Sequence, residues 1–385
     1  MNAKKISMPA FLGGAVTWFG YHCGAGFASG RQVWLYACRY GKAGILPCII
    51  AWTITASFIY VTTEYARIRR VNSYRELCPG IYNTDNPVVG RGILLLWDIM
   101  VLLTAIIGGG GCVAGCGTLA KDVLGIPYLW GCAAFIVGMF ALICFGSDVL
   151  KRLSKVGVVL ILVFFAIVTT GLIKNFPRLI EVMTTDLGAP VVEVSMKTLL
   201  ISGITYGVAQ SSFFQTSCII AKDFQTQMDT RKFIIWGFIF NCGAMLVSYL
   251  CLMSLYPAIG ESQIPIMGVV QNFSGISGLV LTLAYYVVLV LAYVTTVGSV
   301  LVGVIARYTP VLGKAVKSER GCRVIILFLI LGLNAVLSTL GLDGVLLKGN
   351  SFNATLRTPV WVVPILILGP LAIAKAKKLK KENSL

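Results

Sequence analysis

The chain has 385 residues, of which 57% are hydrophobic and only 12% charged, and its mean hydropathy is +0.86. This composition excludes a water-soluble globular protein, because a chain of this length could not hide so much apolar surface from water. The net charge of +17 does not indicate nucleic-acid binding, since the basic residues gather in the segments between apolar stretches, as they do in membrane proteins.

Apolar segments long enough to cross about 30 Å of hydrocarbon recur from one end of the chain to the other. They predict ten transmembrane spans, at residues 8–38, 43–66, 89–117, 127–146, 154–173, 195–221, 231–256, 276–308, 322–341 and 358–375. No stretch is left for a soluble domain, so residues 1–385 are expected to form one transmembrane domain. The polar connection 257–275 is expected to contain a short interfacial helix. The first segment lacks the short apolar core and cleavage site of a signal peptide, which predicts that it is retained.

The basic residues are unevenly divided between the two sides that ten spans define. If both termini face the cytoplasm, 23 of the 32 Lys and Arg residues lie on the cytoplasmic side and nine on outer segments. Cytoplasmic loops retain Lys and Arg, so we expect a multi-pass protein of the plasma membrane lipid bilayer with both termini inside. The twelve cysteines are scattered over the apolar spans, so they are expected to form neither a metal site nor a disulfide framework. No cofactor is expected.

The sequence GYHCGAGFASGRQ, residues 20–32, places four glycines, the single histidine and an arginine inside the first span. Small residues could form a packing face between helices. The span has 31 residues, however, which is too long for one perpendicular crossing, and Gly24-Ala25-Gly26 lies near its middle. Glycine tolerates unwound backbone, which survives at membrane depth only inside the protein or along a cavity. We therefore expect two half-helices around a binding site.

A second interruption is expected at the matching place in the second half of the chain. Ten spans divide into five and five, and the sixth span is polar at its centre, Tyr206–Ser212, with a glycine among these residues. Many transporters consist of two inverted repeats with a broken helix in each. The positions predict one repeat at about 8–173 and a second at about 195–375.

The residues GAGFASG, Gly24–Gly30, resemble the glycine-rich first-helix signature of the YkvI-like membrane proteins. They also resemble, more loosely, the G-S/A-G-I-F motif of the amino acid/polyamine/organocation superfamily. The resemblance to the YkvI-like proteins covers nearly the whole chain. It implies an all-α membrane protein of the LeuT type, with a 5+5 inverted repeat and helices 1 and 6 broken around a central substrate. The family has Gly-Gln-Glu after the signature, where this chain has Gly30-Arg31-Gln32. Any role of the family's glutamate is therefore not carried over to Gln32.

A possible cation site lies on the eighth span, where Ala292, Thr295 and Thr296 share one helical face. This A-x-x-[ST]-[ST] spacing resembles the half-site that sodium-coupled transporters of the LeuT fold carry on helix 8. The resemblance implies a sodium site made of the Gly20, Cys23 and Ala292 carbonyls with the two threonine hydroxyls. Five neutral oxygens suit a monovalent cation. The simpler alternative is that each threonine hydroxyl only bonds a carbonyl one turn back in its own helix.

Three charged residues are candidates for coupling or gating. Lys155 could supply the fixed positive charge of a proton-coupled transporter, although its basic neighbours favour a plain cytoplasmic flank. Asp98 is the one acid well inside a predicted span, so it is either functional or paired with a basic residue that locks helices together. Arg31 resembles the gating arginine of the sodium symporters in its position. The predicted tenth span contains no acid that could pair with it.

The cavity between the half-helices is expected to bind the solute. Helix N-termini carry partial positive charge, so the backbone after Gly26 and after Gln210 should favour a carboxylate or another electron-rich group. A lone histidine in a membrane segment is more often a packing residue than a proton carrier, but His22 lies at the predicted break. The candidate substrate-binding residues are Tyr21, His22, Gly24, Ala25, Gly26, Tyr206, Gly207, Gln210 and Ser211.

Together these patterns predict a secondary active transporter for an amino acid or a related small solute, driven by sodium. Alternating access would come from helices 1, 2, 6 and 7 rocking as one bundle against the others. A proton-coupled transporter of the same fold and a membrane sensor that binds without translocating are the alternatives. An enzyme is not expected, because the chain has one histidine and no cluster of intramembrane acids. No nucleic-acid partner is expected and no oligomeric state is predicted.

Overall fold

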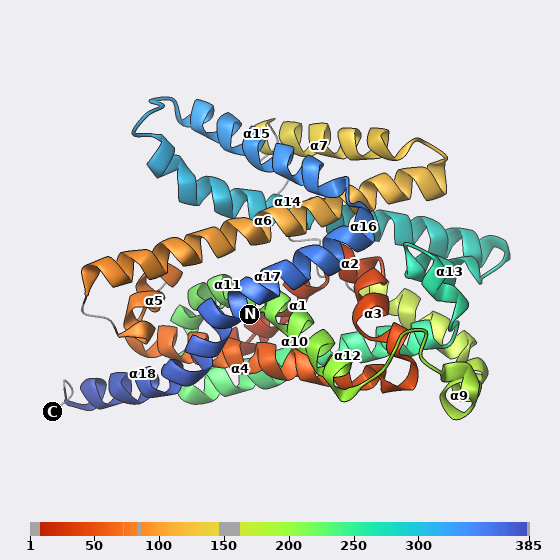
Figure 1. Cartoon of the computed structure of the whole chain (residues 1–385), viewed down its shortest axis with the longest axis horizontal. Helices are drawn as coiled ribbons and strands as arrows, with labels where there is room; N and C mark the ends of the chain where they lie inside the picture. The colour runs from red at the N-terminus through yellow and green to blue at the C-terminus, as the bar shows by residue number, and fades with distance from the viewer. Residues whose placement is uncertain (1–7, 72, 84–85, 146–161, 383–385) are drawn as a thin grey trace, which may run out of the picture.

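The computed structural model describes residues 8–71, 73–83, 86–145 and 162–382, and these residues are helical almost throughout, with no strand among them (Figure 1). Helices of the first half are α1 (Ala10–His22), α2 (Ala25–Ala28), α3 (Arg31–Tyr36), α4 (Ile45–Arg69), α5 (Tyr74–Tyr82), α6 (Pro87–Leu124), α7 (Tyr128–Phe145), the helix Leu162–Lys174 and α9 (Phe176–Thr184). Those of the second half are α10 (Met196–Gln210), α11 (Phe214–Ile220), α12 (Gln227–Met253), α13 (Pro265–Gln271), α14 (Gly275–Leu312), α15 (Glu319–Ser338), α16 (Gly341–Gly344), α17 (Asn350–Arg357) and α18 (Val363–Glu382). The predicted all-α class is confirmed.

Six described segments are long and apolar enough to cross a membrane. They are Cys38–Arg69, Pro87–Leu124, Gln227–Met253, Gly275–Leu312, Glu319–Ser338 and Gly341–Glu382. The helix Leu162–Lys174 and α9 make a seventh if they count as one span, with a bend of 68° between them. The other predicted spans are the shorter apolar α7 and the two that are interrupted, the first (α1 to α3) and the sixth (α10 and α11). Every predicted span therefore contains described helix, and of the fifth, 154–173, the structure describes the part from Leu162 onward.

The long helices lie in two groups that run along the longest axis of the molecule (Figure 1). In the lower group of this view α4 packs against α10, α12 and α18, and α1 packs against α12. In the upper group α6 packs against α7, α14 and α15. The first, second, sixth and seventh spans thus contact one another, which is the grouping predicted for a rocking bundle.

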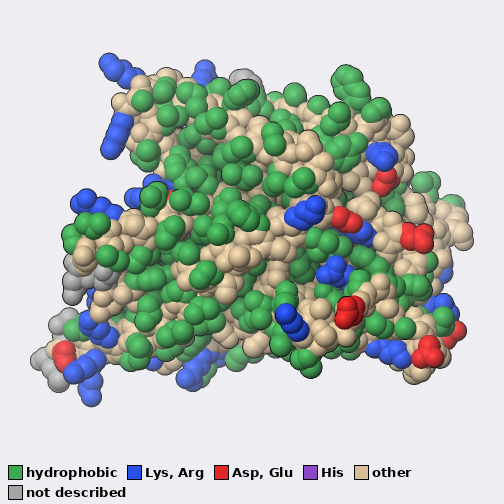
Figure 2. Space-filling view, viewed as in Figure 1, with side chains coloured by type: hydrophobic (Ala, Val, Ile, Leu, Met, Phe, Trp, Pro, Cys, Tyr) green, Lys and Arg blue, Asp and Glu red, His purple; other side chains and the backbone are tan. Residues whose placement is uncertain are grey.

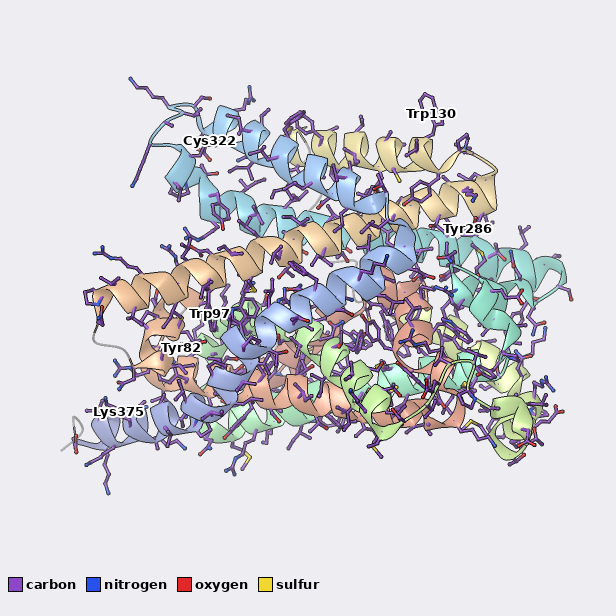
Figure 3. The ribbon with its side chains drawn as sticks, in the orientation of Figure 1. Tyr82, Trp97, Trp130, Tyr286, Cys322 and Lys375 are labelled. Carbon is purple, nitrogen blue, oxygen red and sulfur yellow. The ribbon has the colours of Figure 1, made fainter. Side chains whose placement is uncertain are left out.

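The outer surface is that of a multi-pass membrane protein. Figure 2 shows apolar side chains covering the middle of the molecule, with Lys and Arg gathered mainly at its left end, where the C-terminal helix finishes. Lys375 and Cys322 are labelled at this left end in Figure 3, and Trp130 lies toward the opposite end. The Trp130 side chain is 67% exposed, as expected of an aromatic residue at a membrane–water interface.

Local sequence signals set the ends of α6, the helix that contributes glycines to the centre of the molecule. The Asn86 side chain accepts hydrogen bonds from the backbone N–H groups of Val88 and Val89, and Pro87 fills the first helical position. Gly125 ends the helix in the left-handed conformation, with φ +65°. The helix therefore extends beyond both ends of the predicted span 89–117.

The prediction was wrong about the connection between the ninth and tenth spans. Residues 342–357 were expected to form an outer segment, but they continue as helix through α16, α17 and two π-helical turns, Val345–Gly349 and Thr358–Val362. Figure 1 shows α16 and α17 between the two groups of long helices. The side chains of Asn350, Asn353 and Arg357 are buried in the protein, and a hydropathy pattern cannot distinguish a segment with such residues from a loop.

Candidate functional site

The first span is broken where its glycines begin. α1 ends at His22, and the Gly24 N–H donates to the His22 carbonyl at 2.7 Å, whereas a continuous helix would direct it to the Gly20 carbonyl. The chain breaks again at Gly30, whose φ is +80°. A Cβ atom at Gly30 would lie 2.8 Å from the Ile266 side chain, so this position requires glycine for both conformation and space. The predicted break in the first helix is confirmed.

The sixth span is interrupted more mildly than expected. Between α10 and α11 the chain forms one 3₁₀ turn, Ser211–Phe213, and its backbone dihedral angles stay close to helical values. Gly207 lies inside α10, not in an unwound gap, and a Cβ there would be 2.6 Å from the Ala51 carbonyl oxygen. The Thr55 hydroxyl donates to the Gly207 carbonyl at 3.0 Å. Gly207 therefore serves the close approach of α10 to α4.

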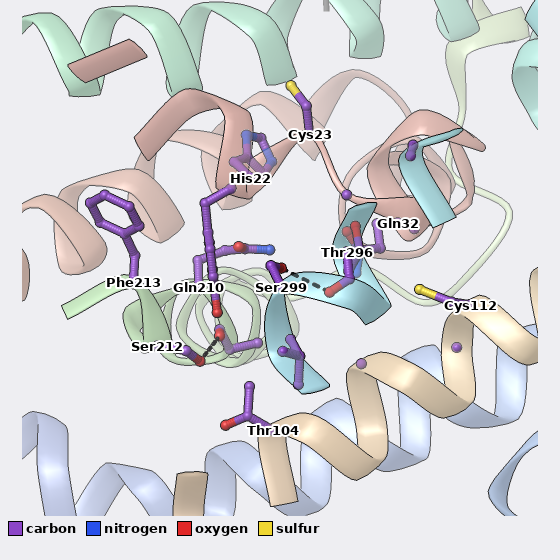
Figure 4. A pocket seen from close by; sticks show the side chains of 18 of the residues that line it. His22, Cys23, Gln32, Thr104, Cys112, Gln210, Ser212, Phe213, Thr296 and Ser299 are labelled. Atoms are coloured by element: carbon purple, nitrogen blue, oxygen red, sulfur yellow. Dashed lines mark hydrogen bonds between the residues drawn. The ribbon is translucent and has the colours of Figure 1, made fainter. Parts of the chain in front are cut away.

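A cavity of about 480 Å³ lies beside the break in the first helix (Figure 4). This volume is within the usual range for sites that bind small molecules. Most of the cavity lining comes from the end of α1, α2, α6, the junction of α10 with the 3₁₀ turn Ser211–Phe213, α14 and α17. Ten of the predicted site residues line it, namely Gly20, Tyr21, His22, Cys23, Gly24, Gly26, Gln210, Ala292, Thr295 and Thr296. The structure thus brings together residues that are nearly 280 positions apart in the sequence (from 20 to 296).

Of the remaining candidates, five are placed away from the cavity lining, Ala25 is described by its backbone alone, and one lies outside the described residues. Ala25 is the first residue of α2, and Ser211 is buried, with its hydroxyl donating to the Val208 carbonyl at 2.7 Å. Tyr206 and Gly207 are packed within the protein behind the cavity lining, and Arg31 and Asp98 form the ion pairs described below. Lys155 lies outside the described residues.

His22 is held in place by aromatic neighbours. Its Nε2 atom is 2.8 Å from the Tyr206 hydroxyl, and its ring centroid lies 4.3 Å from those of Phe27 and Trp52. The side chain is only 2% exposed, and its Nδ1 atom has no hydrogen-bond partner among the described residues. Tyr206 therefore orients His22 at the cavity wall and leaves one ring nitrogen unoccupied.

The candidate cation site pairs the helix break with the eighth span. A Cβ on Gly24 would lie 3.1 Å from the Thr296 hydroxyl oxygen, so the break and α14 approach closely. The Thr295 hydroxyl donates to the Leu291 carbonyl at 2.8 Å and lies 3.2 Å from the Ala292 carbonyl. This is the bond that the simpler alternative requires, but it uses only the hydroxyl proton and leaves oxygen lone pairs that can face a cation.

The glycine-rich part of α6 has two roles. At Gly109 a Cβ would be 2.1 Å from the Asn334 side chain, and at Gly115 it would be 2.6 Å from the Tyr293 hydroxyl, so these glycines allow α15 and α14 to approach. Gly108 and Gly111 instead line the cavity. The run therefore provides both helix packing and bare backbone facing the site.

Arg31 has an acidic partner that the sequence did not indicate. Its Nε and Nη2 atoms each lie 2.5 Å from an oxygen of Asp343 in α16, and its Nη1 donates to the Gly260 and Ser262 carbonyls, both at 2.8 Å. The expectation that the tenth span has no acid to pair with Arg31 is wrong. This span begins at Gly341, before the predicted start, and therefore includes Asp343. The pair joins α3, α16 and the connection before α13.

Asp98 is paired with basic residues. Its carboxylate lies 2.6 Å from Arg307 in α14 and 3.3 Å from Arg75 in α5, and it accepts a hydrogen bond from the Tyr74 hydroxyl. Asp98 does not line the cavity. Of the two roles that the sequence left open, the contacts match the one in which Asp98 locks helices together.

Several cavity residues come from residues 342–357, the segment that was wrongly predicted to be a loop. Asn350, Asn353 and Arg357 line the cavity from α17, together with Thr104 of α6 and Ser212 of the 3₁₀ turn. The spacing of 350, 353 and 357 places the three α17 residues on one helical face. That periodicity is the signal that could have revealed them.

Comparison with solved structures gives the fold. MhsT, solved in complex with L-phenylalanine, matches with a TM-score of 0.58 and 10% sequence identity, over 98% of this chain and 99% of that one. A manganese transporter from Eremococcus coleocola, solved in complex with an aromatic bis-isothiourea substituted compound, matches with a TM-score of 0.46 and 10% identity, over 96% and 95% of the two chains. No protein-family model and no curated protein sequence matches. The likeness to MhsT shows a membrane protein with the LeuT-type fold, as predicted.

Proposed function

We propose that this protein is a secondary active transporter that carries an amino acid or a related small solute by alternating access, with sodium as the coupling ion. The observation that carries the proposal is the cavity of about 480 Å³ at the break in the first helix, in a chain of LeuT-type fold. A continuous helix would leave no free backbone groups there, whereas the break at Gly24 exposes them to a bound ion and solute.

The arrangement of helices supports alternating access. The first, second, sixth and seventh spans contact one another, and the cavity lies between this bundle and the group around α6 and α14. The ion pair of Arg31 and Asp343 would close one end of the cavity. In this proposal residues 1–385 form one transporter domain of the plasma membrane, with repeats at about 8–173 and 195–375, both termini in the cytoplasm and no enzymatic activity. Membership of the YkvI-like proteins belongs to the same proposal.

Sodium would bind between the Gly20, Cys23 and Ala292 carbonyls and the hydroxyls of Thr295 and Thr296. All five residues line the cavity, and Thr296 approaches the break at Gly24. No carboxylate lines the described part of the cavity, so a monovalent cation suits the site better than a divalent one.

The test is a ligand-stabilisation screen of the purified protein in sodium and in potassium buffer, followed by flux measurements in proteoliposomes. We expect stabilisation by amino acids in sodium, and its loss in Thr296→Ala. Thr282→Ala is the matched control, because Thr282 also lies on α14 and bonds a carbonyl one turn back, at Gly278, but does not line the cavity. Solute-induced stabilisation without flux would contradict transport and favour a membrane sensor.

A proton-coupled transporter of the same fold is the second candidate, because His22 is a titratable group at the cavity wall with an unoccupied Nδ1 atom. Equal stabilisation in sodium and potassium, with uptake driven by a pH gradient and lost in His22→Gln, would favour it over sodium coupling.

A further inference from the structure

Arg357, the last residue of α17, is a buried cation at the cavity wall. Its side chain is 0% exposed, and its Nη1 donates to the Ser212 hydroxyl at 2.7 Å and to the Ala209 carbonyl at 3.2 Å. Its Nη2 donates to the Thr104 hydroxyl and, at 3.4 Å, to the Met100 carbonyl. All four acceptors are neutral oxygens, and Nε has no partner among the described residues.

The charge of Arg357 is not balanced by an acid. Throughout residues 8–71, 73–83, 86–145 and 162–382, no carboxylate forms an ion pair with it. The described cavity lining contains neither Asp nor Glu, and Arg357 is its only Lys or Arg residue. A guanidinium stays protonated in proteins, so the cavity carries a positive charge with no negative counterpart in its described wall.

Such a charge is costly inside a membrane protein and is a functional candidate by default. A purely structural role would need only hydrogen bonds to the carbonyls of α6 and α10, which a neutral amide side chain could supply in part. The chain instead uses the one basic side chain that cannot lose its proton there. The buried ring of Trp361, whose centroid lies 4.9 Å from the Arg357 Cζ atom, packs against the guanidinium.

Hydroxyl groups connect this charge to the helix break. The Tyr21 side chain, on the last turn of α1, lines the same cavity as Ser212 and Arg357, and its ring centroid lies 5.4 Å from that of Phe213, the residue after Ser212. Figure 4 shows Ser212 and Thr104 on the same side of the cavity, across from Cys23 and Thr296. Tyr21, Thr104, Ser212 and Arg357 therefore form one polar corner, the Arg357 corner. The Thr104 and Ser212 hydroxyls donate to the Met100 and Ala209 carbonyls and hold the guanidinium in place, so an anion would meet the Tyr21 hydroxyl beside a fixed positive charge.

We propose that the Arg357 corner binds a carboxylate and that the natural solute therefore carries net negative charge, as an acidic amino acid or a dicarboxylate does. A zwitterion would leave the Arg357 charge unbalanced, and a bound sodium ion would add a second positive charge. A solute with two carboxylates can place one toward the helix break and the other in the Arg357 corner. That the bound anion is also carried across the membrane rests on the proposed function.

The test compares solutes that differ only in charge. Thermal stabilisation of the purified full-length protein is measured in sodium methanesulfonate, whose anion is not a carboxylate, with L-glutamate against L-glutamine, L-aspartate against L-asparagine, and succinate against succinamate. We expect each acid to bind the wild type at least tenfold more tightly than its amide. Arg357→Gln should abolish this preference and Arg357→Lys should keep part of it. Arg178→Gln removes an exposed arginine outside the cavity and should change nothing.

If Arg357→Gln fails to fold, Ser212→Ala and Tyr21→Phe test the same corner, because they remove single hydroxyls and keep the charge. Each should lower the preference for the acid severalfold. Equal binding of acids and amides by the wild type would overturn the proposal, as would stabilisation by chloride with no effect of any carboxylate. Flux of neutral amino acids that Arg357→Gln leaves intact would overturn it while supporting transport. Acid-selective binding without flux would support the corner and contradict the transport function.

Discussion

In the proposed mechanism the ion pair of Arg31 and Asp343 closes one end of the cavity, so removing the charge of Asp343 should open that end. Asp343→Asn keeps the shape of the side chain but replaces the carboxylate that accepts two hydrogen bonds from Arg31, each at 2.5 Å. The arginine would keep only the carbonyls of Gly260 and Ser262 as partners. Its side chain is 7% exposed, so water cannot replace the lost carboxylate without movement of α3 or α16.

The size of the effect follows from this geometry. Breaking a buried ion pair by neutralising one partner costs about 3–5 kcal/mol, and the 35% exposure of the Asp343 side chain reduces this to about 2 kcal/mol. If the pair exists only in the closed conformation, the closed-to-open ratio falls by roughly 30-fold, because about 1.4 kcal/mol corresponds to a factor of ten.

Cysteine labelling can measure this opening directly. Cys23 is a free cysteine at the cavity wall, and its reaction with a bulky membrane-impermeant maleimide can be followed by mass spectrometry of the peptide. We expect Asp343→Asn to raise the labelling rate at Cys23 about tenfold or more. Cys251 is fully buried away from the cavity and reports general unfolding.

A matched control separates the gate from a general charge effect. Glu181→Gln breaks the exposed pair of Arg178 and Glu181, which should contribute little and leave Cys23 labelling unchanged. An unchanged rate at Cys23 in Asp343→Asn would refute the reasoning, and so would an equal increase at Cys251, because either result would mean that the ion pair does not hold this end closed.

Three further predictions concern stability and ion binding. Gly207→Ala should destabilise by about 1–3 kcal/mol in thermal unfolding, because a Cβ would press on the α4 backbone, whereas Gly243→Ala meets open space and should not destabilise. Glu64→Gln should cost about 3 kcal/mol by the same measurement, since the buried carboxylate pairs with Arg67 at 2.7 Å. Gly24→Ala should abolish sodium-dependent stabilisation by crowding the Thr296 hydroxyl; sodium dependence unchanged from the wild type would contradict this.

The break in the first helix could be predicted because its causes are local. A long apolar segment with Gly24 near its middle is read directly from the sequence, and lipid cannot satisfy unwound backbone, so a site beside it follows. The structure places that break beside the cavity and beside Thr296. The sixth span was less predictable, because Gly207 serves helix packing and the chain forms a 3₁₀ turn where an open gap was expected.

The sequence by itself determined the membrane class and the place of the first break, because hydropathy and glycine content act along the chain. Only the tertiary structure decided that residues 342–357 are helix in the centre of the protein, that Asp343 forms an ion pair with Arg31, and that Arg357 is buried at the cavity wall. In the sequence, a polar residue looks the same whether it lies in a loop or in the interior of the protein. Which of the two it occupies depends on the helices that surround it.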